Sequence, residues 1–167
     1  MFCIGQYVVY GKSGICRVEA IGTLSFMKDS SKIYYTLRPS YTTNNARIYV
    51  PVNTSVSMRS AITSDEVFCC LDSLKDMEVK IFRSSKQNLL TAHYQELIAG
   101  QDIDGYLRLF KEICWKEKLV KDSGKKLAQV DQRFYKLAER ILSEEFSIVL
   151  QETPECSKKR LYDAVSG

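Results

Sequence analysis

The chain has 167 residues, of which 45% are hydrophobic and 26% are charged, which is close to ordinary globular usage. This composition excludes an intrinsically disordered protein, and apolar runs of at most five residues are far shorter than a membrane span of about 20. The first 60 residues carry seven basic and two acidic side chains, a net charge of +5, whereas the remaining 107 carry −1. We therefore expect any attraction to an acidic partner to come from the first third of the chain.

The compartment is predicted from the cysteines and from the first residues. The six cysteines form no C-x-x-C motif and accompany a single histidine, so we expect reduced thiols, no metal and no cofactor. Residues 1–5 have neither a basic segment nor an apolar core, which predicts no secretory signal. We expect a cytoplasmic monomer with no membrane contact.

The first 60 residues have the pattern of short β-strands. Cys16, Val18 and Ala20 alternate with charged residues, and Ile33 begins a second alternation toward the interior. Gly22 is a candidate for a bulge or sharp bend. The expected strands cover residues 7–10, 15–21, 32–38 and 47–52. Short strands separated by turns predict a small barrel or sandwich.

From about residue 62 the hydrophobic period becomes helical. Thr63 and Glu66 have the spacing of a capping box. A second helix is expected from Ser84 or Ser85 to Gly100, where glycine ends it. Further helices are expected over 102–115, over 124–150 and from 153 onward. The prediction is an α+β protein with a β domain over 1–60 and a domain of about five helices over 61–167.

The sequence offers no catalytic constellation above background. Gly11-Lys12-Ser13 resembles the end of a phosphate-binding loop, but Gln6 stands where that motif needs glycine. His93 lies beside the apolar stripe of a predicted helix, where a hydrogen-bonded structural imidazole is the better interpretation. Nucleophilic catalysis needs a positioned base, so we expect a protein that is not an enzyme.

The helical part contains the chain's one tryptophan and a local basic patch. Trp115, at the expected end of the third helix, is interpreted as core packing, given the usual burial of tryptophan. A basic cluster follows it, for which a solvated loop between helices is the first interpretation and contact with phosphates is the sharper alternative. The cluster comprises Lys116, Lys118, Lys121, Lys125 and Lys126.

The order and spacing of several motifs resemble the opening of the CarD family of bacterial RNA-polymerase-binding regulators. The polymerase-interacting domain of transcription-repair coupling factor is similar over the same stretch. The helical remainder resembles the family more loosely, mainly through Gln95-Glu96-Leu97-Ile98-Ala99-Gly100. The motifs of the first third are Phe2-x-x-Gly5-x-x-Val8-Val9-Tyr10, Gly14-Ile15, Val18-Glu19-Ala20-Ile21, Tyr34/Tyr35-x-Leu37, Tyr49-Val50-Pro51-Val52 and Met58-Arg59.

The resemblance implies a Tudor/SH3-like β module that docks on the polymerase β subunit by strand-edge pairing. Family members commonly place arginine in the docking surface, where this chain has Leu24 and Tyr49. The contact implied here is therefore more apolar, or shifted in register. By position, the docking surface falls on Thr23, Leu24, Ser25, Phe26, Arg47, Ile48 and Tyr49.

The resemblance also bears on DNA. The family's helical domain uses a tryptophan at the start of its second helix as a wedge beside the promoter bubble, and the matching position here falls near Lys86. Without that wedge, promoter DNA contact would be weak and non-specific. The alternative is a protein–protein adaptor that does not touch DNA. The candidate DNA contacts are Arg83, Lys86, Lys116, Lys118, Lys121, Lys125 and Lys126.

Overall fold

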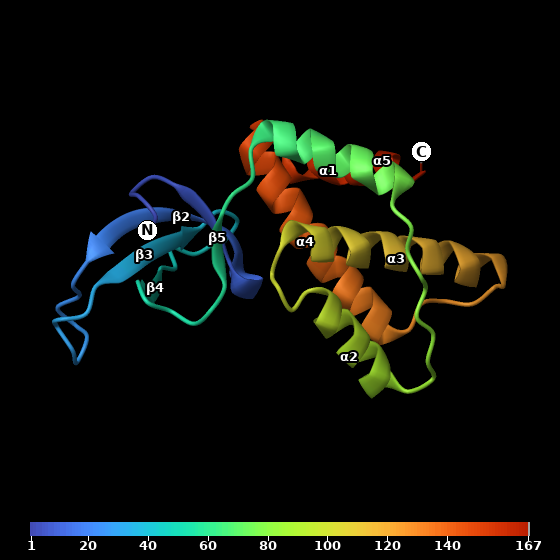
Figure 1. Ribbon diagram of the computed structural model, residues 1–167, viewed down its shortest axis with the longest axis horizontal. Coiled ribbons are helices and arrows are strands. Elements are labelled where there is room, and N and C mark those ends of the chain that lie inside the picture. The colour runs from blue at the N-terminus through green and yellow to red at the C-terminus, as the bar shows by residue number, and fades with distance from the viewer. Residues whose placement is uncertain (167) are drawn as a thin grey trace. The chain divides into compact units, whose positions relative to one another are not determined.

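A computed structural model describes residues 1–166 of the chain. The chain divides into two compact units, which are treated separately below. The N-terminal unit, Met1–Ile62, contains all five strands, and the helical unit, which begins at Thr63, contains all five helices of the described chain (Figure 1). The predicted α+β class is thereby confirmed.

The N-terminal unit is one antiparallel sheet in the strand order β4-β3-β2-β1-β5. A short 3-10 turn joins β1 to β2, and Gly11 and Gly14 adopt positive φ angles of 47° and 75° there. Within residues 1–166, β4 and β5 pair with one neighbour each, so the sheet is open and a closed barrel is not confirmed. The strands are β1 (Tyr7–Tyr10), β2 (Gly14–Gly22), β3 (Tyr34–Pro39), β4 (Ile48–Pro51) and β5 (Met58–Ser60). The sequence pattern missed β5.

An irregularity in β2 changes which side chains face the core. The β2–β3 register shifts between Val18 and Ala20, which leaves Glu19 as the extra residue of a bulge. Before the bulge, Val18 is buried as predicted; after it, Ala20 is exposed and Ile21 packs against the core. The inward placement of Ala20 was therefore wrong, because one inserted residue moves the following side chains to the opposite face.

The main hydrophobic cluster of the N-terminal unit lies on one face of this sheet, and Val9 and Ile15, which point to the other face, are also buried. Tyr35 and Leu37 are buried as predicted, whereas Ile33 precedes β3 and is 45% exposed. The Phe2 ring packs edge-on against Tyr35, and the Phe2 N–H donates to the Tyr35 hydroxyl. The buried cluster consists of Val8, Cys16, Val18, Tyr35, Leu37 and Val50.

The five predicted helices are present, with shifted ends. The Thr63–Glu66 capping box is confirmed, because each side chain bonds the other residue's backbone N–H. The predicted serine cap of the second helix is wrong: Lys86 is the N-cap residue, and Ser84 accepts the Lys86 N–H instead. The helices are α1 (Ser64–Asp76), α2 (Gln87–Leu97), α3 (Ile103–Asp122), α4 (Gln129–Leu150) and α5 (Pro154–Ser166).

The helical unit is organised around α4, which contacts each of the other four helices. Large side chains such as Tyr106, Phe110 and Phe146 are completely buried in its core. Trp115 is 46% exposed, so its predicted core position is wrong; α3 continues past it for two turns and presents it to solvent. In the described chain, none of the helices is long and apolar enough to cross a membrane.

Candidate functional site

The open edge of the sheet at β4 is the first candidate site. The Val52 N–H donates to the Ile33 carbonyl. Because hydrogen-bonded and non-hydrogen-bonded pairs alternate along an antiparallel ladder, this bond shows which β3–β4 pairs are hydrogen-bonded. Tyr49 faces Thr36 in a pair that exchanges no hydrogen bonds, so the Tyr49 N–H and C=O point away from β3, toward the open edge. The next residue along this edge that faces outward is Pro51, which has no N–H. Tyr49 is therefore the outward-facing donor of β4.

An aromatic pair stands beside this edge. The rings of Phe26 and Tyr49 meet edge-to-face with centroids 5.0 Å apart. Phe26 is 64% exposed and Tyr49 is 38% exposed, so both present apolar surface to solvent. Phe26 comes from the β2–β3 connection, where the Met27 N–H closes a turn on the Leu24 carbonyl. The fold thus joins two segments that are 23 residues apart in sequence.

The other predicted docking residues have different surroundings. Thr23 and Ser25 are exposed, whereas Ile48 packs against the core cluster. Arg47 is held in place: its Nε lies 2.5 Å from the Glu19 carboxylate. Glu19 is the extra residue of the β2 bulge. Its carboxylate also lies 3.7 Å from the guanidinium of a second arginine, Arg38. The exposed part of the predicted surface is therefore aromatic and hydroxylic, with its arginine already paired.

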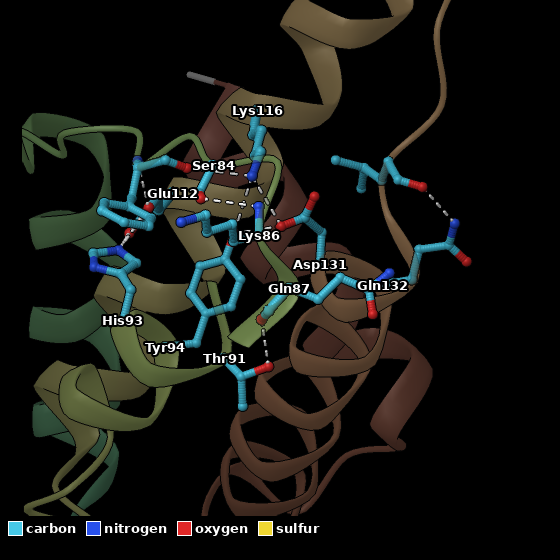
Figure 2. Close-up of polar contacts among 12 residues, drawn as sticks. Ser84, Lys86, Gln87, Thr91, His93, Tyr94, Glu112, Lys116, Asp131 and Gln132 are labelled. Carbon is cyan, nitrogen blue, oxygen red and sulfur yellow. Dashed lines mark hydrogen bonds and ion pairs between the residues drawn. The ribbon is translucent and has the colours of Figure 1, made fainter. Parts of the chain in front are cut away.

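The helical unit contains a buried polar cluster of Tyr94, Lys116 and Asp131, from α2, α3 and α4. Figure 2 shows the Tyr94 phenol and the Lys116 ammonium converging on the Asp131 carboxylate. The Tyr94 hydroxyl donates over 2.5 Å, and Lys116 Nζ donates over 3.0 Å. Burial, followed by the hydrogen bond to Asp131, raises the pKa of Tyr94 far above its ordinary value. Charges this deep persist only when paired.

Two side chains of α3, Glu112 and Lys116, hold the extended segment that precedes α2. Glu112, which is buried, accepts the Phe82 N–H at 3.0 Å and contacts His93 Nε2 at 2.9 Å. The Phe82 carbonyl accepts from Lys116 Nζ at 3.2 Å. The Phe82 ring also stacks on His93. The predicted hydrogen bond of His93 is present, and Glu112 and Lys116 together hold the N–H and C=O of Phe82.

Comparison with known families bears on the N-terminal unit. Residues 2–62 match the model of the CarD-like/TRCF RID domain. The N-terminal unit is a CarD-like/TRCF RID domain. The chain is accordingly an RNA-polymerase-interacting, transcription-related protein. No curated protein matches the chain significantly. The resemblance predicted for the first third is confirmed, and the looser one for the helical remainder stays a prediction.

The RID domain contains all seven predicted docking residues, whereas the seven candidate DNA contacts lie in the helical unit. Lys116 is buried with Asp131, which removes its ammonium from any surface that could meet a phosphate. Lys118 lies over the Trp115 ring and Lys121 pairs with Glu117. Because α3 ends at Asp122, these three lysines are helical, and the expected loop begins after them.

The remaining candidates lie on the surface. Lys86 is exposed at the start of α2. Arg83, Lys125 and Lys126 line one cavity, together with the segment before α2 and the α3–α4 loop. The structure therefore brings together two basic groups that are about 40 residues apart in sequence. Among the described residues, no group of three His, Cys, Asp or Glu side chains could hold a metal ion.

Proposed function

We propose that the RID domain docks on the β subunit of RNA polymerase by accepting an extended strand along β4. The observation that carries this proposal is the open edge at Tyr49, whose N–H and C=O face outward beside the exposed Phe26 ring. Strand addition gains affinity from main-chain hydrogen bonds and specificity from alternate side chains. The open five-stranded sheet with a bulged β2 is compatible with the Tudor/SH3-like module that the family resemblance implies.

The residues of this edge offer different kinds of contact to a partner strand. Tyr49 offers one donor and one acceptor, and Pro51, the next outward-facing residue of β4, offers no donor. The Phe26–Tyr49 pair supplies apolar area of the kind that dominates interface energies. Arg47 is already neutralised by Glu19, so it contributes little attraction to an acidic partner. We therefore propose a mainly apolar and backbone-mediated contact.

The proposed role is a non-enzymatic regulator of transcription initiation, in which the helical unit adds at most weak contacts to DNA phosphates. Lys86 and Arg83 are exposed ahead of α2, and Lys118, Lys125 and Lys126 are exposed around the end of α3. Lysines at phosphates give affinity that depends on salt but carry no sequence information. The adaptor alternative, without DNA, is favoured by the burial of Lys116.

The test measures binding of variants of the 167-residue chain to the isolated polymerase β subunit. Tyr49→Ala removes the ring and should weaken binding by about 1–2 kcal/mol, or about 5- to 30-fold. Tyr49→Pro also removes the outward N–H, without touching the β3–β4 ladder, and should cost about 0.5–1.5 kcal/mol more. Tyr7→Ala is the matched control, because Tyr7 and Tyr49 are both 38% exposed.

The outcomes separate the alternatives. Equal affinity for Tyr49→Ala and Tyr49→Pro would mean that no backbone bond forms at Tyr49, and strand addition along β4 would be wrong. Equal losses for Tyr7→Ala and Tyr49→Ala would move the interface away from β4. Circular dichroism must show a native spectrum for each variant. Adding promoter DNA to the complex decides the second part: a salt-dependent gain in affinity supports DNA contact, and no change supports the adaptor.

A further inference from the structure

A cavity of about 700 Å³ lies in the helical unit, between the segment before α2 and the α3–α4 loop. This volume is within the range of about 300–1,000 Å³ that is typical of small-molecule sites. Ser84 and Ser85 line one side of it. The Ser84 hydroxyl accepts the Lys86 N–H, so its own proton remains a donor. The apolar lining consists of Leu90, Leu119, Val120, Leu127 and Ala128.

The exposed charged side chains of this cavity are all positive. Arg83, Lys125 and Lys126 line it and are exposed, and within residues 1–166 none of these three side chains forms an ion pair. Asp131 is the only carboxylate among the described residues that line it, and that carboxylate is 2% exposed and bonded to Lys116 and Tyr94. The accessible wall therefore carries three positive charges.

Lys116 is not available to a ligand, although it also lines the cavity. Its ammonium has three donors and three acceptors within reach: the Phe82 carbonyl, the Tyr94 hydroxyl and the Asp131 carboxylate. The Lys116–Asp131 ion pair thus forms a buried part of the cavity lining that carries no net charge. Only the exposed cations remain to select a ligand.

We propose that this cavity binds a nucleoside diphosphate that is free in solution. A diphosphate carries about three negative charges near neutral pH, which matches the charge of Arg83, Lys125 and Lys126. The guanidinium of Arg83 suits bidentate phosphate contact, and the lysines act as point charges. The apolar side chains Leu119, which is 42% exposed, and Leu127 offer a surface for the base. Such a ligand would lie between the α3–α4 loop and the segment before α2.

This inference goes beyond the polymerase and DNA contacts proposed above, and it does not rest on them. A duplex presents phosphates on its outside and keeps its bases stacked, so it could reach the cations but not the apolar lining. A free nucleotide can contact both. Failure of nucleotide binding would leave docking by β4 untouched, because that contact uses residues of the N-terminal unit alone.

The test is isothermal titration calorimetry of the 167-residue chain with ADP at low ionic strength. We expect saturable binding that adenosine and pyrophosphate each match only at about tenfold higher concentration or more, since each lacks one half of the recognition. The variant Lys125→Gln/Lys126→Gln should weaken ADP binding at least about tenfold. The matched control Lys118→Gln/Lys121→Gln removes the same charge from the same region, outside the cavity lining, and should change it less than about twofold.

Three results would overturn the proposal. The first is no heat of binding with ADP at about 1 mM. The second is an equal loss in both double variants, which would indicate diffuse charge attraction without a site. The third is pyrophosphate binding as tightly as ADP, which would mean that only an anion is held. A parallel titration with a short DNA duplex distinguishes the source of phosphate: duplex binding that Lys125→Gln/Lys126→Gln abolishes, with no ADP binding, would assign the cations to DNA.

Discussion

Removing the charge of Lys116 tests whether its buried ion pair with Asp131 stabilises the helical unit. Lys116→Met keeps a long apolar stem but deletes the ammonium that bonds Asp131 and the Phe82 carbonyl. The Asp131 side chain is 2% exposed, so its carboxylate would keep only the Tyr94 hydroxyl as partner. A surface lysine, as the sequence suggested, would tolerate this change.

The expected loss follows from burial. Removing one partner of a buried ion pair lowers the free energy of unfolding by about 3–5 kcal/mol, because the other charge stays buried without a counter-charge. Neutralising that charge as well, in Lys116→Met/Asp131→Asn, should recover about half of the loss, and the double-mutant cycle isolates the coupling. Lys118→Met, two residues along on the exposed side of α3, should stay within about 0.5 kcal/mol of wild type.

Urea unfolding followed by tryptophan fluorescence measures these differences. The chain has one tryptophan, Trp115, which lies in the helical unit and therefore reports that unit alone. Far-ultraviolet circular dichroism of the helices should give the same midpoints. If Lys116→Met lies within about 1 kcal/mol of wild type, or if the double variant is less stable than the single one, the pairing with Asp131 does not hold the helices together.

Three further predictions concern other groups. Burial raises the pKa of Tyr94 above its ordinary 10.0, so its stabilisation is complete below pH 10.0 and is lost as pH rises toward the folded-state value; alkaline unfolding of wild type and Tyr94→Phe should differ, and identical pH profiles would contradict this. Burial raises the pKa of the Cys114 thiol to about 12, so iodoacetamide near pH 8 should label exposed Cys3 first by mass spectrometry, and equal rates would refute it. Lys86→Trp should prolong the polymerase–promoter open complex under heparin challenge, because it places a stacking surface where the resembled family has its wedge; a wild type that prolongs it equally would contradict this.

The elements that could be predicted from sequence are those with local signals. The capping box at Thr63 needs only residues three apart, and the alternation through Val18 needs only its neighbours. The strand β5 has three residues and no such pattern, and it forms because β1 offers it an edge. The bulge at Glu19 also escaped, because a register shift is defined by the partner strand and not by the shifted residue.

From the sequence alone follow the order of a β unit and a helical unit and the concentration of positive charge in the first. Which charged and aromatic side chains are accessible depends on the folded arrangement. It buried Lys116 against Asp131, exposed Trp115 and neutralised Arg47 with Glu19. Whether a side chain is buried and paired depends on neighbours that can be many residues away in the sequence. Tyr94 bonds Asp131 across 37 residues, a separation over which no local sequence pattern extends.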